Sequence, residues 1–147
     1  MTTDPDYVQP DLTLYGDEHV RQYQATDGKV GHDWNGTTCL ILTTRGRRSG
    51  TARSRPLIYT SHGDAYVVAA SYGGAPQHPA WYLDLQADPR AEVQVKADRF
   101  AATARTAEGA EREQLWQLMT GVWPNYDLYT KRTDRRIPVV ILDRDRT

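Results

Sequence analysis

Five arginines gather in a stretch of the chain that has no carboxylate. Residues 34–63 contain no Asp or Glu, yet they hold Arg45, Arg47, Arg48, Arg53 and Arg55. Guanidinium groups repel one another, and their planar fork suits phosphate and carboxylate oxygens. The stretch therefore predicts a site for an acidic ligand, and a solvated basic hairpin is the alternative.

Two further features could serve a ligand. Tyr72-Gly73-Gly74 is a glycine-rich turn, and residues 123–129 form an aromatic segment that reads Trp-Pro-Asn-Tyr-Asp-Leu-Tyr. The chain has no phosphate-loop motif and no serine nucleophile elbow. The four histidines lack the spacing of metal ligands, so we expect no metal.

Three short helices are expected to position these features. Residues 17–26 are acidic at the start and are followed by Gly28, which ends the helix. Residues 79–87 fit a helix or a strand, and Pro79 at the first turn favours the helix. Residues 109–121 carry apolar side chains at helical spacing, which we expect to be core, namely Leu115, Leu118, Met119 and Val122.

The remaining apolar stretches predict about six strands. β-branched or alternating segments cover residues 38–44, 53–60, 65–71, 91–96, 100–106 and 137–142. The strands follow one another mostly through hairpins, with the first three in antiparallel succession, and few long crossovers separate them. The fold class is therefore mainly β (α+β), a small antiparallel barrel.

The bulk composition bounds the class of protein. A chain of 147 residues fits one domain, and we place residues 1–16 in a flexible N-terminal arm and residues 17–147 in the barrel. The net charge of −1 argues against a nucleic-acid binder. No apolar run approaches membrane-spanning length and the N-terminus is not a secretory signal, so a cytoplasmic location is expected.

Four sequence blocks together resemble the deazaflavin-dependent nitroreductase family. They are residues 42–50 (LTTRGRRSG), 70–74 (ASYGG), 79–85 (PAWYLDL), and 123–126 (WPNY) with 132–138 (RTDRRIP). The resemblance runs from about His19 to Leu142. It implies a split β-barrel of the kind that also binds FMN, and a coenzyme, F-420, which is an 8-hydroxy-5-deazaflavin with a phosphate and a polyglutamate tail.

The resemblance also implies which residues bind the coenzyme. The phosphate and tail contacts carry over to the turn and the strand after it, namely Arg47, Arg48, Ser49, Arg53, Ser54, Arg55, Pro56, Leu57 and Ile58. The ring and its ribityl chain would lie against Ala69, Ala70, Ser71, Tyr72, Ala80, Trp81, Tyr82, Leu83, Asp84 and Tyr126. Trp81 and Tyr82 have core packing as their alternative. Family members usually carry Asn where this chain has Asp84, and a carboxylate there can only accept hydrogen bonds unless it is protonated.

For the acceptor, the resemblance implies a pocket walled by Ile58, Ser71, Trp123, Tyr126 and Tyr129. Trp123 and Ile58 stand where the nitroreductase pattern has tyrosines, so a quinone fits this pocket at least as well as a nitroaromatic. The expected function is hydride transfer from reduced F-420 to a planar conjugated acceptor. Tyr126 would be the catalytic proton or hydrogen-bond donor, and Ser71 would orient the substrate.

Several alternatives stay open at this point. An FMN-dependent oxidoreductase could use the same barrel, although the number of arginines favours a polyanionic tail over one phosphate. The alternative that is not an enzyme is a non-catalytic carrier of the deazaflavin or of an apolar ligand. The expected partner is a small planar molecule and no nucleic acid. The state is either monomer or homodimer, and a peripheral contact with the inner face of the cell membrane would suit a quinone substrate.

Overall fold

The structure is a computed structural model that describes residues 7 and 9–145. Within these residues it contains eight strands, four α-helices and one short 3-10 helix. In chain order they are α1 (Gly16–Thr26), β1 (Asp33–Trp34), β2 (Thr37–Arg45), β3 (Ala52–Ile58), β4 (Thr60–His62), β5 (Ala65–Ala69), η1 (Tyr72–Gly74), α2 (Ala80–Ala87), β6 (Arg90–Val95), β7 (Asp98–Thr106), α3 (Gly109–Val122), α4 (Asn125–Tyr129) and β8 (Val139–Arg144).

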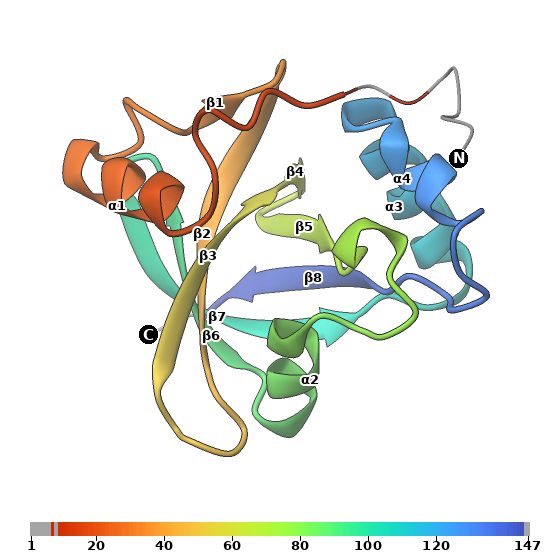
Figure 1. The fold of residues 1–147 in the computed structure, drawn as a ribbon. Helices are drawn as coiled ribbons and strands as arrows, with labels where there is room; N and C mark the ends of the chain where they lie inside the picture. The colour runs from red at the N-terminus through yellow and green to blue at the C-terminus, as the bar shows by residue number, and fades with distance from the viewer. Residues whose placement is uncertain (1–6, 8, 146–147) are drawn as a thin grey trace.

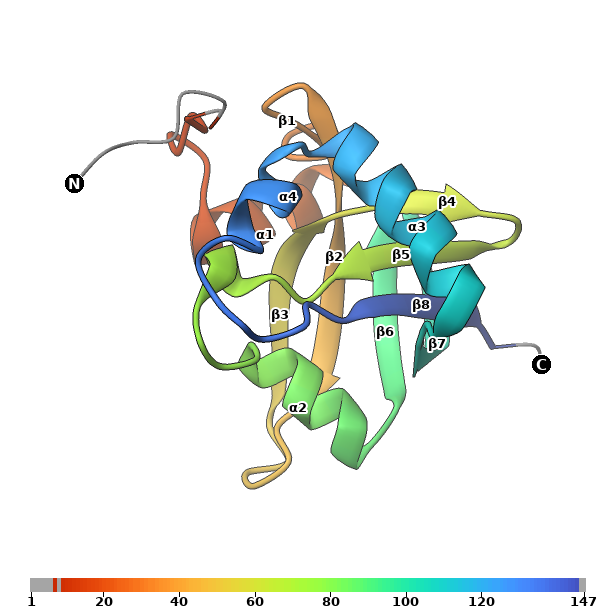
Figure 2. The ribbon, with the colours of Figure 1, turned by 90° about the vertical axis from the view of Figure 1, so that its right-hand side faces the viewer.

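The strands form one antiparallel sheet in the order β1-β2-β6-β7-β8-β5-β4, with β3 paired to β2. The sheet curls into an open half-barrel (Figure 1). The long β2–β3 hairpin runs down beside α2, whereas α3 and α4 lie on the side of β5 and β8 (Figure 2). This architecture confirms the mainly β, antiparallel split barrel expected from the sequence.

Strand alternation supplies two separate core clusters. In β5 and just beyond it, Val68 and Ala70 face the barrel interior, where they meet Trp81 and Leu85 of α2. The alternate residues Val67 and Ala69 face the other way, toward the cluster formed with side chains of α3 and α4. Because successive side chains of a strand point to opposite faces, one strand is covered on both sides.

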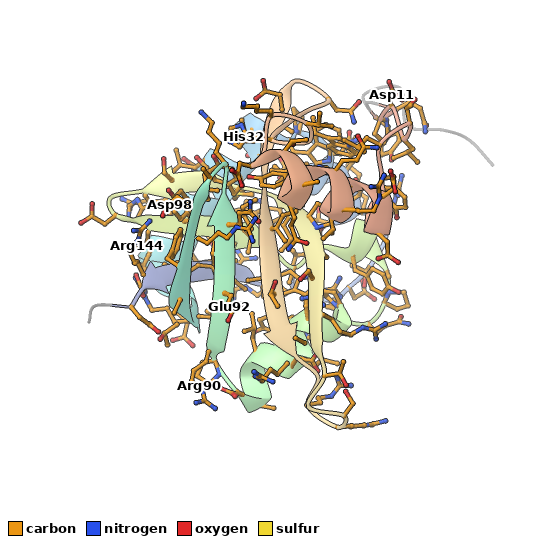
Figure 3. The ribbon with its side chains drawn as sticks, turned by 90° about the vertical axis from the view of Figure 1, so that its left-hand side faces the viewer. Asp11, His32, Arg90, Glu92, Asp98 and Arg144 are labelled. Carbon is orange, nitrogen blue, oxygen red and sulfur yellow. The ribbon has the colours of Figure 1, made fainter. Side chains whose placement is uncertain are left out.

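The outer face of β6 is polar. Arg90 and Glu92 project from the outer face of β6 in Figure 3. Asp98 of β7 and Arg144 of β8 form an ion pair and share the interior face with Phe100 and Leu142. On another part of the outer face α1 covers β2, since Val20 and Tyr23 pack on Ile41.

The predicted return strand over residues 53–60 is broken in the structure. β3 ends at Ile58, and β4 begins at Thr60 with β5 as its partner. At the break, the Tyr59 amide donates to the Thr38 carbonyl at 3.1 Å. The expected hairpins are present, but the return strand is not continuous: β3 pairs with β2, and β5 pairs with β4 and β8 rather than with β3. In a curled sheet, one extended segment can pair with different strands along its length. The alternation of apolar and polar side chains does not reveal where the partner changes.

The other predicted elements are present with shifted ends, and several short elements were not predicted. The strand expected to reach Ser71 ends at Ala69, and the last strand starts at Val139, after Pro138, rather than at Ile137. β1, β4 and α4 are too short to give a periodic signal, so the counts of six strands and three helices were low. Leu118, expected in the core, is 45% exposed because it lies on the outer face of α3.

Candidate functional site

A pocket of about 330 Å³ lies among β3, β5, α1 and α4. All five residues expected to bind the acceptor line it: Ile58, Ser71, Trp123, Tyr126 and Tyr129. Pro56, Leu57 and Ala69 from the expected coenzyme set line it too. The volume is at the lower end of the range for small-molecule sites. Segments that are about 65 residues apart in the sequence are thus brought to one cavity.

α4 sets the aromatic side of this pocket. Pro124 precedes the helix, and Tyr126 and Tyr129 are three residues apart, so both project from one face. Their ring centroids are 6.1 Å apart at an interplanar angle of 74°. The Trp123 indole N–H donates to the Tyr129 hydroxyl at 3.4 Å. This bond leaves Tyr126 as the tyrosine of the pair with a free hydroxyl.

The Tyr126 hydroxyl is suited to donate to a ligand. Tyr126 is buried, and no residue in the described part of the chain forms a hydrogen bond with its hydroxyl. Burial, with a smaller contribution from Tyr129, raises the pKa of Tyr126 above its ordinary value. The group therefore keeps its proton at neutral pH.

Another part of the pocket wall comes from residues that the sequence did not single out. The His19 ring of α1 stacks on Trp34 of β1 with a centroid distance of 6.2 Å, and Trp34 lies 5.9 Å from the Trp123 ring. His19 Nε2 is 2.8 Å from the Gly31 carbonyl oxygen, which fixes the ring. A Cβ on Gly31 would lie 2.9 Å from that ring, so glycine is required here. No spacing rule links these residues to α4, and only the fold brings them together.

The N-terminal segment also borders the pocket. Pro10, Leu12 and Tyr15 line it. Asn35 fixes the segment with two bonds, accepting from the Asp11 amide at 2.7 Å and donating to the Asp11 carbonyl at 2.9 Å. In Figure 1 the segment crosses the top of the half-barrel from α1 toward α4. Residues 1–6 and 8 of the expected flexible arm lie outside the described residues, and the boundary at residue 16 stays a prediction.

The arginine-rich turn closes the β2–β3 hairpin. Its backbone is held by bonds from the Gly46 amide to Thr51 and from the Gly50 amide to Gly46, at 3.0 and 2.8 Å. Ser49 Oγ accepts from the Thr51 amide at 3.1 Å. Arg48 and Arg53 are exposed, and neither forms an ion pair within the described part of the chain. These two guanidinium groups are available to an anion.

Tertiary structure brings a carboxylate to this turn, which the local sequence lacks. Asp84 of α2 is 5% exposed and accepts from the Arg47 amide at 3.0 Å and from Arg47 Nη1 at 2.9 Å. Arg47 is thus already paired. Arg55 donates to the Thr44 hydroxyl at 2.8 Å, and burial lowers the pKa of Arg55 to about 10, against an opposing effect of Asp84. Arg55 remains charged at neutral pH.

The expected ring-binding residues divide between faces. Trp81 and Tyr82 are buried in the barrel interior, and the Tyr82 hydroxyl is 2.9 Å from the Thr106 hydroxyl. Ala70 also faces this interior. Tyr72 is 57% exposed and Ala80 is exposed, whereas Leu83 is partly buried. The side chains of Trp81 and Tyr82 therefore have the core packing that was the alternative interpretation.

β3 connects the arginine turn to the pocket. Arg53 and Ser54 lie at the turn end of the strand, and Pro56, Leu57 and Ile58 lie at the pocket end. The Ser54 hydroxyl is 2.6 Å from the Thr43 hydroxyl of the neighbouring strand. Five residue steps along a strand span roughly 17 Å. An elongated ligand with a planar group at one end and anionic groups at the other fits this arrangement.

Within the described residues, no group of three or more His, Cys, Asp or Glu side chains could hold a metal ion. None of the described helices is long and apolar enough to cross a membrane.

Comparison with known proteins gives a consistent result. The family model described as "F420H(2)-dependent quinone reductase" matches residues 16–144, which include all four sequence blocks that carried the resemblance. A Mycobacterium tuberculosis protein named as an F420H(2)-dependent quinone reductase is 38% identical over 130 residues, 86% of this chain and 87% of that protein.

Two solved structures are similar in sequence and in fold. One, described as an F420-H2-dependent reductase, is 40% identical with a TM-score of 0.67, covering 71% of this chain and 93% of its own. The other is described as a domain-swapped dimer and is 36% identical with a TM-score of 0.70, covering 84% of this chain and 96% of its own.

Proposed function

Because this chain belongs to the F420H(2)-dependent quinone reductase family, we propose that it reduces a quinone or a similar planar acceptor with reduced coenzyme F-420. The observation that carries the proposal is the convergence of Ile58, Ser71, Trp123, Tyr126 and Tyr129 on one pocket, which β3 joins to the arginine turn. The mycobacterial relative named as a quinone reductase supports the choice of acceptor class.

The residues present fit the coenzyme. Arg48 and Arg53 would hold its phosphate and tail, because their guanidinium groups are exposed and have no ion-pair partner among the described residues. Pro56, Leu57 and Ala69 would border its ring at the pocket end of β3. When bound, the coenzyme supplies the hydride.

The protein's own groups hold the acceptor and a proton. Trp123 and Tyr129 are buried and offer flat faces for a conjugated ring. The Tyr126 hydroxyl donates to the oxygen of the acceptor that becomes negative, and Ser71 orients the acceptor. All these groups come from one chain, so both a monomer and a homodimer are compatible with the site.

Titration of the protein with F-420 and with FMN, followed by fluorescence, tests the coenzyme. We expect tight binding of F-420, weak binding of FMN, and a loss of F-420 affinity of about tenfold in Arg48→Ala and in Arg53→Ala. Arg21→Ala is the matched control, since Arg21 is exposed on α1 and pairs with Glu18. Preferential FMN binding would favour the FMN oxidoreductase, and F-420 binding without reduction of any quinone would favour the carrier.

We also propose that the mouth of the pocket contacts the inner face of the cell membrane, where a quinone would be found. Leu12, Tyr15 and Tyr72 are exposed by 50%, 66% and 57%; the first two line the pocket and Tyr72 lies between lining residues Ser71 and Gly73. Co-sedimentation with phosphatidylglycerol vesicles should be reduced in Leu12→Ser/Tyr72→Ser. Equal sedimentation of wild type and variant, or none, would contradict this contact.

A further inference from the structure

Arg135 lies in the loop between α4 and β8. All three nitrogens of its guanidinium group donate hydrogen bonds to one other loop. Nε donates to the Ala75 carbonyl at 3.1 Å, and Nη2 donates to the Ser71 carbonyl at 2.7 Å. Nη1 donates to the Ala70 carbonyl at 3.1 Å and lies 2.9 Å from His78 Nδ1. Four acceptors on residues 70–78 thus converge on a single side chain.

The backbone that these bonds hold is unusual. Tyr72, Gly73 and Gly74 are consecutive residues with positive φ, at 48°, 62° and 80°. A left-handed conformation costs a residue with a side chain about 1 kcal/mol or more, so Tyr72 adopts it only because its surroundings impose it. At Gly74 a Cβ would lie 2.8 Å from the Tyr129 carbonyl oxygen, so the loop sits directly against α4.

The loop has few bonds of its own. The Gly74 amide donates to Ser71 and the Ala75 amide donates to Tyr72, each at 3.0 Å, and the Ala70 amide donates to Pro138 at 2.9 Å. The carbonyl groups of Ala70 and Ala75 point instead to Arg135. Without the guanidinium group these acceptors would lose their partner, at a cost that favours another loop conformation.

Two residues of this loop, Ser71 and Gly73, line the pocket. We propose that Arg135 is a positioning residue for acceptor reduction: it fixes the loop of residues 70–75 so that Ser71 meets the acceptor. This inference rests on the proposed function for its catalytic consequence. A guanidinium group is required because its planar fork reaches several acceptors at once, whereas a lysine offers one point charge.

The first test compares Arg135→Lys with Arg136→Lys, a matched control whose side chain is 70% exposed. Amide hydrogen exchange of residues 70–75 is measured without coenzyme. We expect faster exchange in Arg135→Lys and wild-type exchange in Arg136→Lys. Equal exchange in both variants would overturn the proposal, and this outcome does not depend on enzyme activity.

The second test measures turnover of a soluble quinone such as menadione with reduced F-420. In Arg135→Lys we expect kcat to fall by about tenfold to a hundredfold, since small misplacements of a reacting partner have effects of this size, while F-420 affinity stays close to that of wild type. A wild-type kcat together with faster exchange would overturn the catalytic consequence. An inactive wild type would instead contradict the proposed function, and the exchange result would still decide whether Arg135 fixes the loop.

Chemical rescue separates positioning from a general loss of folding. In Arg135→Ala, millimolar guanidinium chloride should restore part of the lost rate and slow the exchange of residues 70–75, and sodium chloride should not. If neither salt, or both salts equally, restores the rate and the exchange, a specific requirement for the guanidinium group is ruled out.

Discussion

One carboxylate oxygen of Asp84 accepts both the backbone N–H and the Nη1–H of Arg47, at 3.0 and 2.9 Å. The contact joins the tip of the β2–β3 hairpin to α2, two segments that are 37 residues apart. It stabilises the arginine turn and, at the same time, places a buried negative charge next to the groups that we propose bind the tail of F-420. Stability and anion affinity are therefore opposed at this position.

The substitution Asp84→Asn tests that opposition. The amide oxygen can still accept the Arg47 amide, but the ion pair is lost, so we expect a stability loss of about 1–3 kcal/mol. Removal of the negative charge should strengthen F-420 binding by about three- to tenfold at low salt. Urea unfolding and a fluorescence titration measure the two effects. Weaker binding in Asp84→Asn would show that Asp84 supports the coenzyme site directly.

Substitution of Tyr126 by Phe removes the proposed donor and keeps the ring. We expect kcat for quinone reduction to fall by about a hundredfold, the lower end of the range for a general acid, with F-420 affinity changed by less than a few-fold. Tyr66→Phe serves as the control, because the Tyr66 ring packs between Tyr59 and Phe100 rather than in the pocket. A kcat equal to that of the control would remove Tyr126 from the mechanism.

Trp34 is one of the wall residues that the sequence did not indicate. Its ring contacts His19 and Trp123, and its indole N–H donates to the Leu14 carbonyl at 2.8 Å. Trp34→Phe loses that bond and part of the flat surface, so KM for the quinone should rise by about tenfold, in line with the contribution of a large aromatic contact. F-420 affinity should not change.

The comparison variant for this prediction is Trp116→Phe. Trp116 of α3 does not line the pocket, but its ring packs 6.3 Å from that of Tyr126, and its indole N–H donates to Asp127 at 3.1 Å. A similar rise of KM in both variants would mean that the effect is a general one on packing.

His78 should make stability depend on pH. Burial, and then the charge of Arg135, lower the pKa of His78 below 6.5, its ordinary value. The unfolded chain therefore takes up a proton on His78 before the folded chain does, so this contribution to stability is complete above pH 6.5 and is lost as the pH falls below it. Thermal unfolding between pH 8 and pH 5 should show a smaller decrease for His78→Gln than for wild type.

The exposed His62 supplies the control for the pH experiment, since it lies on β4 away from Arg135. His62→Gln should keep the wild-type pH dependence. The same curve for all three proteins would mean that His78 is not the group that titrates.

Elements with local signals could be predicted from the residues alone. The apolar run of β2, the proline before α2 and the helical spacing of α3 each placed an element within a few residues, because propensity and periodicity act over a few neighbouring residues. The resemblance of four sequence blocks likewise indicated the reductase family, which the comparisons confirmed.

The relationships between distant segments follow from tertiary packing. The folding of the whole chain breaks the extended segment at Tyr59, brings Asp84 to Arg47, stacks His19 and Trp34 beside Trp123, and directs Arg135 to the loop of residues 70–75. Such contacts depend on how the sheet curls and on which strand ends meet. They are set by the packing of the whole chain, and no local pattern of residues specifies them.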